Sequence, residues 1–270
     1  MGLKEFYGLK ELPFNNTPDL KYFYKTKKHS LVLNKLNYLI DYKKGLGVVL
    51  GPIGTGKTIL ARLFFEELDP DKYDAALIVV VHSEVTSKWF LKKLCLQLGV
   101  QNIPTEKHEM VNALYQELSK INEMGKKVVI LIDEAQMLSK KEVMEEMRGL
   151  LNFEDEKGKL ITFVLFGLPE LEDNLRQDKP LFQRVSMRFT LEPLSLDETS
   201  QYIKHRLEIA GLEEMIFDSE AVNKIYEYSK GIPRLINTIC DNALFEGFLI
   251  KNHMIDKGLI EQVAQDLGLV

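Results

Sequence analysis

The chain has 270 residues, of which 45% are hydrophobic and 28% are charged, and its formal net charge at pH 7 is −5. This length and apolar content suit one large or two modest globular domains, and the acidic balance provides no basic field over the whole chain for nucleic acid. Residues 1–10 lack the apolar core of a signal peptide, and no uncharged apolar stretch reaches the roughly 18 residues of a membrane span. We therefore expect no integral membrane segment in this chain.

Residues 1–45 form an entry segment in which aromatic residues alternate with turn residues, and positions 28–43 have the apolar spacing of a helix. We expect this segment to pack on the domain that follows it. A short basic stretch lies within it, beside several tyrosines, and comprises Lys21, Lys25, Lys27 and Lys28. Such a stretch can contact a phosphate backbone, but a solvated face with the aromatic rings turned inward is the favoured interpretation.

Strand-like apolar runs then alternate with helical patterns over residues 46–193. Strands are expected at 46–50, 75–81, 127–132, 159–165 and 185–191, with helices at 59–68, 88–98, 111–121 and 141–151. This alternation predicts an α/β domain with a five-stranded parallel sheet that is covered on both faces. The run at 75–81 adds a strand between the strands at 46–50 and 127–132.

The pattern changes after Pro193. Helices are expected at 195–210, 218–230, 232–250 and 256–267, and the first begins with a capping box at Ser195 and Glu198. A small all-helical domain is therefore expected over residues 194–270, after an α/β core that spans residues 46–193.

One stretch identifies a ligand. Residues 51–58 match the P-loop pattern G-x-x-x-x-G-K-[ST], between an apolar strand and an amphipathic helix. The glycines let backbone N–H groups approach phosphate oxygens, and the helix N-terminus adds partial positive charge. We expect Lys57 to reach the β- and γ-phosphates of a nucleoside triphosphate and the Thr58 hydroxyl to bind Mg²⁺. The predicted nucleotide-binding residues here are Gly51, Pro52, Ile53, Gly54, Thr55, Gly56, Lys57 and Thr58.

A second apolar strand ends in two carboxylates, Asp133 and Glu134, which follow residues 128–132. Open α/β sheets bind ligands at the carboxyl ends of their strands. Asp133 is therefore expected to bind the nucleotide and its Mg²⁺, and Glu134 to polarise the attacking water as a general base. Two solvated loop carboxylates are the alternative, which the P-loop upstream makes the weaker one. The extra strand and the adjacent glutamate fit a small GTPase poorly, and the sequence has no guanine-reading Asn-Lys-x-Asp motif.

Three arginines are candidates for stabilising the charge that develops on the γ-phosphate. Arg234 begins a helix of the helical domain, from which it would reach the phosphate and report the nucleotide state to that domain. Arg184 and Arg188 lie just before or within the last strand, and one of them would reach the nucleotide of a neighbouring subunit as an arginine finger. A surface or salt-bridging role is the alternative for each.

The chain as a whole resembles the AAA+ ATPases of the general secretion pathway protein A (ExeA-type) family. The resemblance rests on Phe6-Tyr7-Gly8-Leu9, the P-loop, Asp133-Glu134-Ala135-Gln136, Gly167-Leu168-Pro169-Glu170-Leu171, and the run Gly231-Ile232-Pro233-Arg234-Leu235-Ile236-Asn237. It implies ATP as the nucleotide, a helical lid with Arg234 as the sensor-2 arginine, and self-assembly into a ring or filament with nucleotide at the subunit interfaces.

This chain departs from the family pattern in two respects. Leu168 replaces the usual glutamine, so a polar sensor is missing there or is supplied by another residue. Longer members continue into a transmembrane helix and a peptidoglycan-binding region, so this chain is either a stand-alone member or a part of one.

The function expected is ATP hydrolysis that drives assembly or remodelling of a protein partner in secretion or pilus biogenesis. The expected location is the cytoplasm, with peripheral attachment to the inner membrane through a partner. The alternative is a DNA-binding AAA+ ATPase of the transposition-helper or replication-initiator type, which the basic stretch favours and the acidic balance disfavours. A nucleotide-gated switch that barely hydrolyses ATP is a third possibility, against which Glu134 stands.

Overall fold

The computed structural model describes residues 2–156 and 158–269. The chain divides into two compact units, each of which draws on separate segments of the sequence. The α/β unit comprises Lys27–Gly51 and Leu60–Leu191, and the helical unit comprises Met1–Thr26, Pro52–Ile59 and Glu192–Val270.

The α/β unit is built on a five-stranded sheet, as the alternating pattern predicts. In spatial order its strands are β2 (Tyr73–Val79), β3 (Lys127–Asp133), β6 (Ile161–Gly167), β1 (Leu46–Leu50) and β7 (Met187–Thr190). Every pair of neighbours is parallel. All residues of β1 and β6 are buried, which is typical of parallel strands that are covered on both faces.

The strand that separates the P-loop strand from the acidic strand is not the one expected from chain order. The run at 75–81 corresponds to β2, which pairs with β3 at the edge of the sheet, and β6 lies between β3 and β1. The expectation of an intervening strand at 75–81 is therefore wrong in space. The apolar pattern of a segment predicts a strand of the sheet, but it does not determine the spatial order of strands that are similarly apolar.

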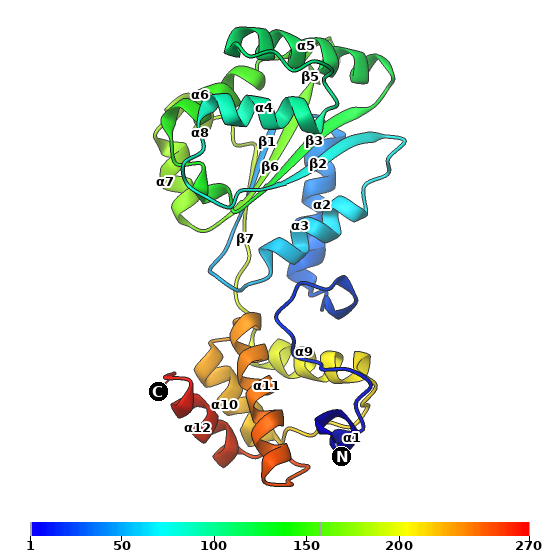
Figure 1. Ribbon diagram of the computed structural model, residues 1–270, viewed down its shortest axis with the longest axis vertical. Helices are drawn as coiled ribbons and strands as arrows, with labels where there is room; N and C mark the ends of the chain where they lie inside the picture. The colour runs from blue at the N-terminus through cyan, green and yellow to red at the C-terminus, as the bar shows by residue number, and fades with distance from the viewer. Residues whose placement is uncertain (1, 157, 270) are drawn as a thin grey trace. The chain divides into compact units, whose positions relative to one another are not determined.

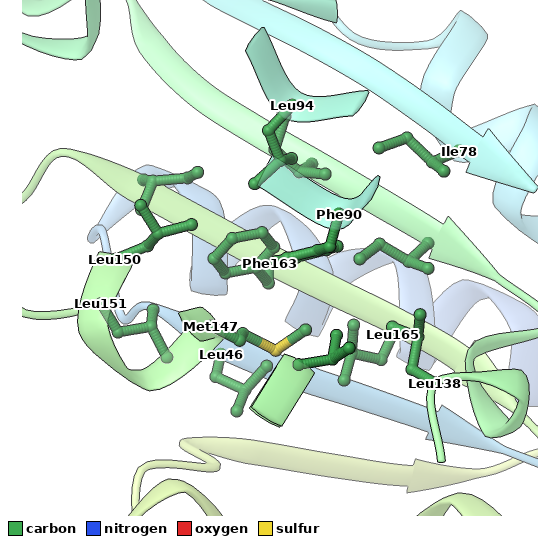
Figure 2. Close-up of a cluster of buried hydrophobic side chains, with 14 of the residues drawn as sticks. Leu46, Ile78, Phe90, Leu94, Leu138, Met147, Leu150, Leu151, Phe163 and Leu165 are labelled. Carbon is green, nitrogen blue, oxygen red and sulfur yellow. The ribbon is translucent and has the colours of Figure 1, made fainter. Parts of the chain in front are cut away.

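Helices cover both faces of this sheet (Figure 1). They are α2 (Lys27–Asp41), α3 (Lys57–Glu66), α4 (Ser87–Gln97), α5 (Lys107–Glu123), α6 (Lys141–Leu150), α7 (Glu170–Arg176) and α8 (Lys179–Phe182), with a 3₁₀ turn, η2 (Ala135–Met137), and a small hairpin, β4 (Glu154–Asp155) and β5 (Gly158–Lys159). On one face, Phe90 and Leu94 of α4 and Met147 of α6 pack on Phe163 of β6 (Figure 2). On the other face α2 approaches β1 so closely that a Cβ on Gly47 would lie 2.5 Å from a Leu39 methyl carbon.

The helical unit contains the four helices expected after Pro193. They are α9 (Leu196–Ile209), α10 (Ser219–Ser229), α11 (Pro233–Leu249) and α12 (Lys257–Asp266), joined by the N-terminal elements α1 (Leu3–Tyr7) and η1 (Leu20–Tyr22). The predicted capping box is present, because Ser195 and Glu198 exchange side chain to backbone hydrogen bonds. The interior is apolar and includes Ile236, Ile239 and Cys240 of α11.

The entry segment, residues 1–45, which the sequence leads us to expect on the domain that follows it, contributes to both compact units. Residues 27–41 form α2 of the α/β unit, whereas residues up to 26 belong to the helical unit. There Tyr7, Leu9 and Phe14 are buried in the apolar core, and the Lys10 N–H donates to the Ala210 carbonyl oxygen. Aromatic residues of this segment, such as Tyr7 and Phe14, thus pack in the apolar core of the helical unit. In the part of the chain that the structure describes, no helix has the length and apolar character that crossing a membrane requires.

Candidate nucleotide site

The P-loop curls around the carbonyl oxygen of Pro52. That oxygen accepts hydrogen bonds from the Thr55 hydroxyl and from the Lys57 ammonium, each at 2.9 Å, and a longer one from the Thr55 N–H. Gly54 and Gly56 have φ angles of +82° and +96°, which residues with a side chain rarely adopt. The sequence thus forms the tight, glycine-dependent loop that the P-loop pattern predicts.

Sheet and helix define the two ends of this loop. The Gly51 N–H donates to the Gly167 carbonyl oxygen at 3.2 Å, which joins the start of the loop to the end of β6. At the other end Lys57, which is 6% exposed, and Thr58 are the first two residues of α3. A helix of ten residues therefore directs its N-terminal N–H groups toward the loop, and this arrangement favours an anion.

Arg234 lies beside the P-loop within the helical unit. Its backbone N–H donates to the Gly54 carbonyl oxygen at 3.3 Å, and a Cβ on Gly54 would lie 2.8 Å from the Cβ of Arg234. The Arg234 side chain is exposed, and no hydrogen bond or ion pair joins its guanidinium to another described residue. Pro233 occupies the first turn of α11, where it sacrifices no intrahelical hydrogen bond. The structure thus brings two of the predicted site elements together, and a cationic side chain stands next to the phosphate-binding loop.

The acidic pair lies at the carboxyl end of β3. Asp133 is the last residue of the strand and is 2% exposed. Glu134 follows with φ +55° and ψ +36°, a left-handed conformation that is unusual for a residue other than glycine, and it precedes η2. β1 and β3 are parallel members of one sheet, so Asp133 lies at the same sheet edge from which β1 continues into the P-loop.

Sequence reasoning missed the partner of Glu134. The Gln136 side-chain amide donates to Oε2 of Glu134 at 2.6 Å, and Oε1 of Gln136 accepts the Leu168 N–H at 3.1 Å. Gln136 is the last residue of the Asp-Glu-Ala-Gln run, which in the sequence serves only as evidence for the family resemblance. Its position two residues after Glu134 is the signal that could have indicated this contact. His82, three residues after the end of β2, contacts Trp89 edge to face.

The donor set of the predicted magnesium site fits that ion. Thr58 supplies a hydroxyl oxygen and Asp133 a nearly buried carboxylate, both of which are hard oxygen donors. Among the described residues there is no group of three histidine, cysteine or acidic side chains that would hold a metal alone.

The two finger candidates lie in the α/β unit with different partners. Arg184 follows α8 and donates to the Arg148 carbonyl oxygen at 2.9 Å. Arg188 lies in β7, 3.2 Å from a Glu172 carboxylate oxygen, with its guanidinium over the Phe182 ring and its side chain 43% exposed. Among the described residues the Arg188 guanidinium contacts side chains, whereas that of Arg184 binds a backbone carbonyl, so Arg188 can change partner at a smaller cost.

The basic stretch of the entry segment is partly neutralised. The Lys21 ammonium lies 2.6 Å from a Glu11 carboxylate oxygen and 3.6 Å from one of Asp19. The hydrogen bond from Lys21 lowers the pKa of Glu11, so that carboxylate stays charged at neutral pH. Lys21 therefore adds little net positive charge to this surface.

Strand order, P-loop and acidic pair together define a P-loop NTPase of the AAA type. The chain belongs to the AAA domain family, whose model matches residues 40–175. It is 35% identical, over 98% of its length, to the general secretion pathway protein A of Aeromonas hydrophila, and it covers 48% of that protein. The chain thus spans about half the length of this relative.

Solved structures share the fold at lower identity. The Aeropyrum pernix ORC2 protein, solved as ADPNP–ADP complexes, superposes with a TM-score of 0.65 at 15% identity, over 95% of this chain and 71% of that one. The Aeropyrum pernix ORC1 protein in complex with DNA has a TM-score of 0.65 at 15% identity, over 91% and 67%. At such identities the likeness defines the fold alone, and it confirms the predicted combination of an α/β core and following helices.

Proposed function

We propose that this chain binds and hydrolyses ATP with Mg²⁺, and that the cycle drives assembly or remodelling of a protein partner in secretion or pilus biogenesis. The observation that carries the proposal is the contact between Gly54 of the P-loop and Arg234 of α11. Through this contact, events at the phosphates act directly on a helix of the helical unit, which a nucleotide-driven machine requires.

Each predicted site residue has a role in this proposal. The P-loop N–H groups and Lys57 bind the phosphates, Thr58 and Asp133 hold Mg²⁺, and Arg234 binds the γ-phosphate as it gains charge. Glu134 is the general base for the attacking water. One of Arg184 and Arg188 completes the site of a neighbouring copy in a ring or filament. Leu168 occupies the position at which the family resemblance places a polar sensor, and its backbone N–H donates a hydrogen bond to the Gln136 side chain.

The choice of a protein partner rests on the relative. General secretion pathway protein A is named for secretion, and the similarity covers almost the whole of this chain. The proposed location is the cytoplasm, at the inner membrane when the partner is membrane-bound. DNA binding is the second candidate, supported by the fold shared with an ORC1 protein in complex with DNA. The ion pairs of Lys21 and the net charge of −5 favour the protein partner.

The test is the steady-state ATPase rate per subunit as a function of protein concentration, with and without double-stranded DNA. Glu134→Gln is the control, because it keeps the shape of the side chain and removes the base. A rate that rises with concentration, ignores DNA and vanishes in Glu134→Gln supports an assembling ATPase with a protein target. A rate that rises steeply with DNA and falls as salt is added supports the DNA-bound alternative. Equal rates in the wild type and in Glu134→Gln would contradict the role of Glu134.

A further inference from the structure

The side chain of Gln136 joins the candidate general base to the end of the neighbouring strand. Its Nε2 donates to Glu134 at 2.6 Å, and its Oε1 accepts the Leu168 N–H at 3.1 Å. A carboxylate only accepts and a backbone N–H only donates, so both bonds form in just one orientation of the amide. The two contacts therefore fix the amide plane of Gln136 completely.

The surroundings of Gln136 are shaped for this position. Gly167 lies against it, and a Cβ there would come within 3.1 Å of Oε1 and 2.8 Å of a Leu171 methyl carbon, so a side chain at position 167 would compete with the amide. From α7, the Asn174 side-chain amide donates to the Gln136 carbonyl oxygen at 2.7 Å, which holds the η2 turn in place. Gln136 is thus supported from β6 and from α7.

Glu134 needs such support. Its backbone is in the left-handed region, which costs a non-glycine residue about 1–2 kcal/mol, and its side chain leaves the tip of a strand. A general base is efficient only when its carboxylate is held in a fixed direction. A carboxylate has two oxygens, and a hydrogen bond to Oε2 leaves the other one to polarise water.

We propose that Gln136 is a positioning residue for hydrolysis, which holds the Glu134 carboxylate in its working orientation and couples it to the β6–α7 junction at Leu168. The inference deepens the proposed function and rests on it. Where the family resemblance places a polar sensor at position 168, this chain has Leu168, and the polar side chain at that junction comes from Gln136. Gln136 acts through Glu134 and has no part in binding the nucleotide.

Gln136→Glu tests this role. The variant keeps an oxygen that accepts from Leu168, but it places a second carboxylate against Glu134 and removes the donor. We expect kcat to fall at least about tenfold, a part of the 10²–10⁴ that a positioned base contributes, while the dissociation constant for ATP changes less than about twofold. Gln97→Glu is the matched control, because Gln97 is the exposed last residue of α4 and undergoes the same chemical change. Gln136→Met, which cannot donate, serves if Gln136→Glu fails to fold, and the same fall in kcat is expected.

A double-mutant cycle with Glu134→Gln separates positioning from a general structural role. If Gln136 acts through Glu134, adding Gln136→Glu to Glu134→Gln lowers the residual rate no further. The double variant also exchanges the amide and the carboxylate, so it restores the hydrogen bond and is expected to regain the melting temperature of the wild type while staying inactive. Three results would overturn the inference: kcat within twofold of the wild type in Gln136→Glu, an equal loss of ATP affinity and kcat, or an independent further loss in the Glu134→Gln background. The proposed function itself fails instead if Glu134→Gln hydrolyses ATP as fast as the wild type.

Discussion

The backbone N–H of Arg234 donates a hydrogen bond to the carbonyl oxygen of Gly54 at 3.3 Å, and a Cβ on Gly54 would lie 2.8 Å from the Cβ of Arg234. Gly54 thus meets two demands at once. Its φ of +82° requires a residue that tolerates the left-handed region, and the approach of Ile232 and Arg234 leaves no room for a Cβ. The tight turn of the P-loop imposes the first demand, although the pattern itself leaves position 54 open, and the N-terminal end of α11 imposes the second.

Gly54→Ala is therefore expected to weaken ATP binding at least about tenfold, because the new methyl group lies 2.8–2.9 Å from Arg234 and Ile232 and distorts the loop. Titration of a fluorescent ATP analogue measures this loss. Gly125→Ala is a matched control, since Gly125 has the same φ of +82° but a Cβ at that position would meet no atom within 4 Å. Both variants carry a backbone strain of about 1–2 kcal/mol. Equal nucleotide affinity in the two variants would show that the approach of α11 does not constrain the loop.

Arg234→Ala is expected to lower kcat by about 10²–10³, the usual effect of removing one donor that stabilises charge in the transition state. The affinity for ATP is expected to change only a few-fold, because the P-loop and Lys57 supply most of the phosphate contacts. Arg234→Lys keeps the charge and is expected to recover part of the rate. Single-turnover hydrolysis and nucleotide titration separate the two effects. Arg62→Ala, at an exposed position of α3, is the control and should behave as the wild type. A loss of affinity as large as the loss of rate would argue that Arg234 serves binding alone.

How far the sequence predicts this molecule depends on which interactions are local. The apolar runs and Ser195 predict their strands, helices and cap correctly, because burial and capping leave a periodic or short-range signal. The P-loop is predicted as well, since its chemistry requires a fixed spacing. The position of β6 between β1 and β3 was not predicted, because all three strands are equally apolar.

Contacts between distant residues account for the rest. Gln136 and Leu168 meet only because β3 and β6 are neighbours, and that pairing cannot be read from either sequence segment. Likewise, Phe14 finds its place beside Phe217 of the helical unit, more than 200 positions away along the chain. The aromatic pattern of the entry segment indicated that it is buried but not against which domain.

Arg206 of α9 links residues 13–22 to the rest of the helical unit, and replacing it tests how this segment is held. The Arg206 side chain is 6% exposed, donates to the carbonyl oxygens of Pro13 and Asn15, and stacks over the Tyr22 ring at 4.6 Å. Arg206→Met leaves these carbonyls without a donor and is expected to destabilise the fold by about 3 kcal/mol. Urea unfolding measures that loss.

Limited trypsin digestion supplies a second readout for the same variant, because cleavage after Lys21 should become faster when residues 13–22 loosen. Lys204→Met is the control on α9, since the Lys204 side chain is 59% exposed and its ammonium makes a long ion pair of 3.7 Å with Glu208. It should change neither the unfolding curve nor the digestion pattern. Unchanged digestion in Arg206→Met would show that apolar contacts of residues such as Phe14 hold the segment without the arginine.

Mixing two inactive variants identifies the arginine that serves a neighbouring copy. The Arg188 guanidinium contacts the side chains of Glu172 and Phe182 and is the better candidate, whereas Arg184 donates to the Arg148 carbonyl oxygen. Arg188→Ala alone and Glu134→Gln alone are each expected to be inactive. In a mixture, a Glu134→Gln subunit still carries Arg188 and supplies it to the site of an Arg188→Ala subunit, which still carries its base. Random assembly at equal amounts should then restore about a quarter of the wild-type rate per subunit.

Arg184→Ala provides the comparison. Its mixture with Glu134→Gln should show no such recovery if Arg184 only supports α6 of its own subunit. Recovery with Arg184→Ala and none with Arg188→Ala would reverse the assignment, and an Arg188→Ala protein that is fully active alone would exclude Arg188 from the site.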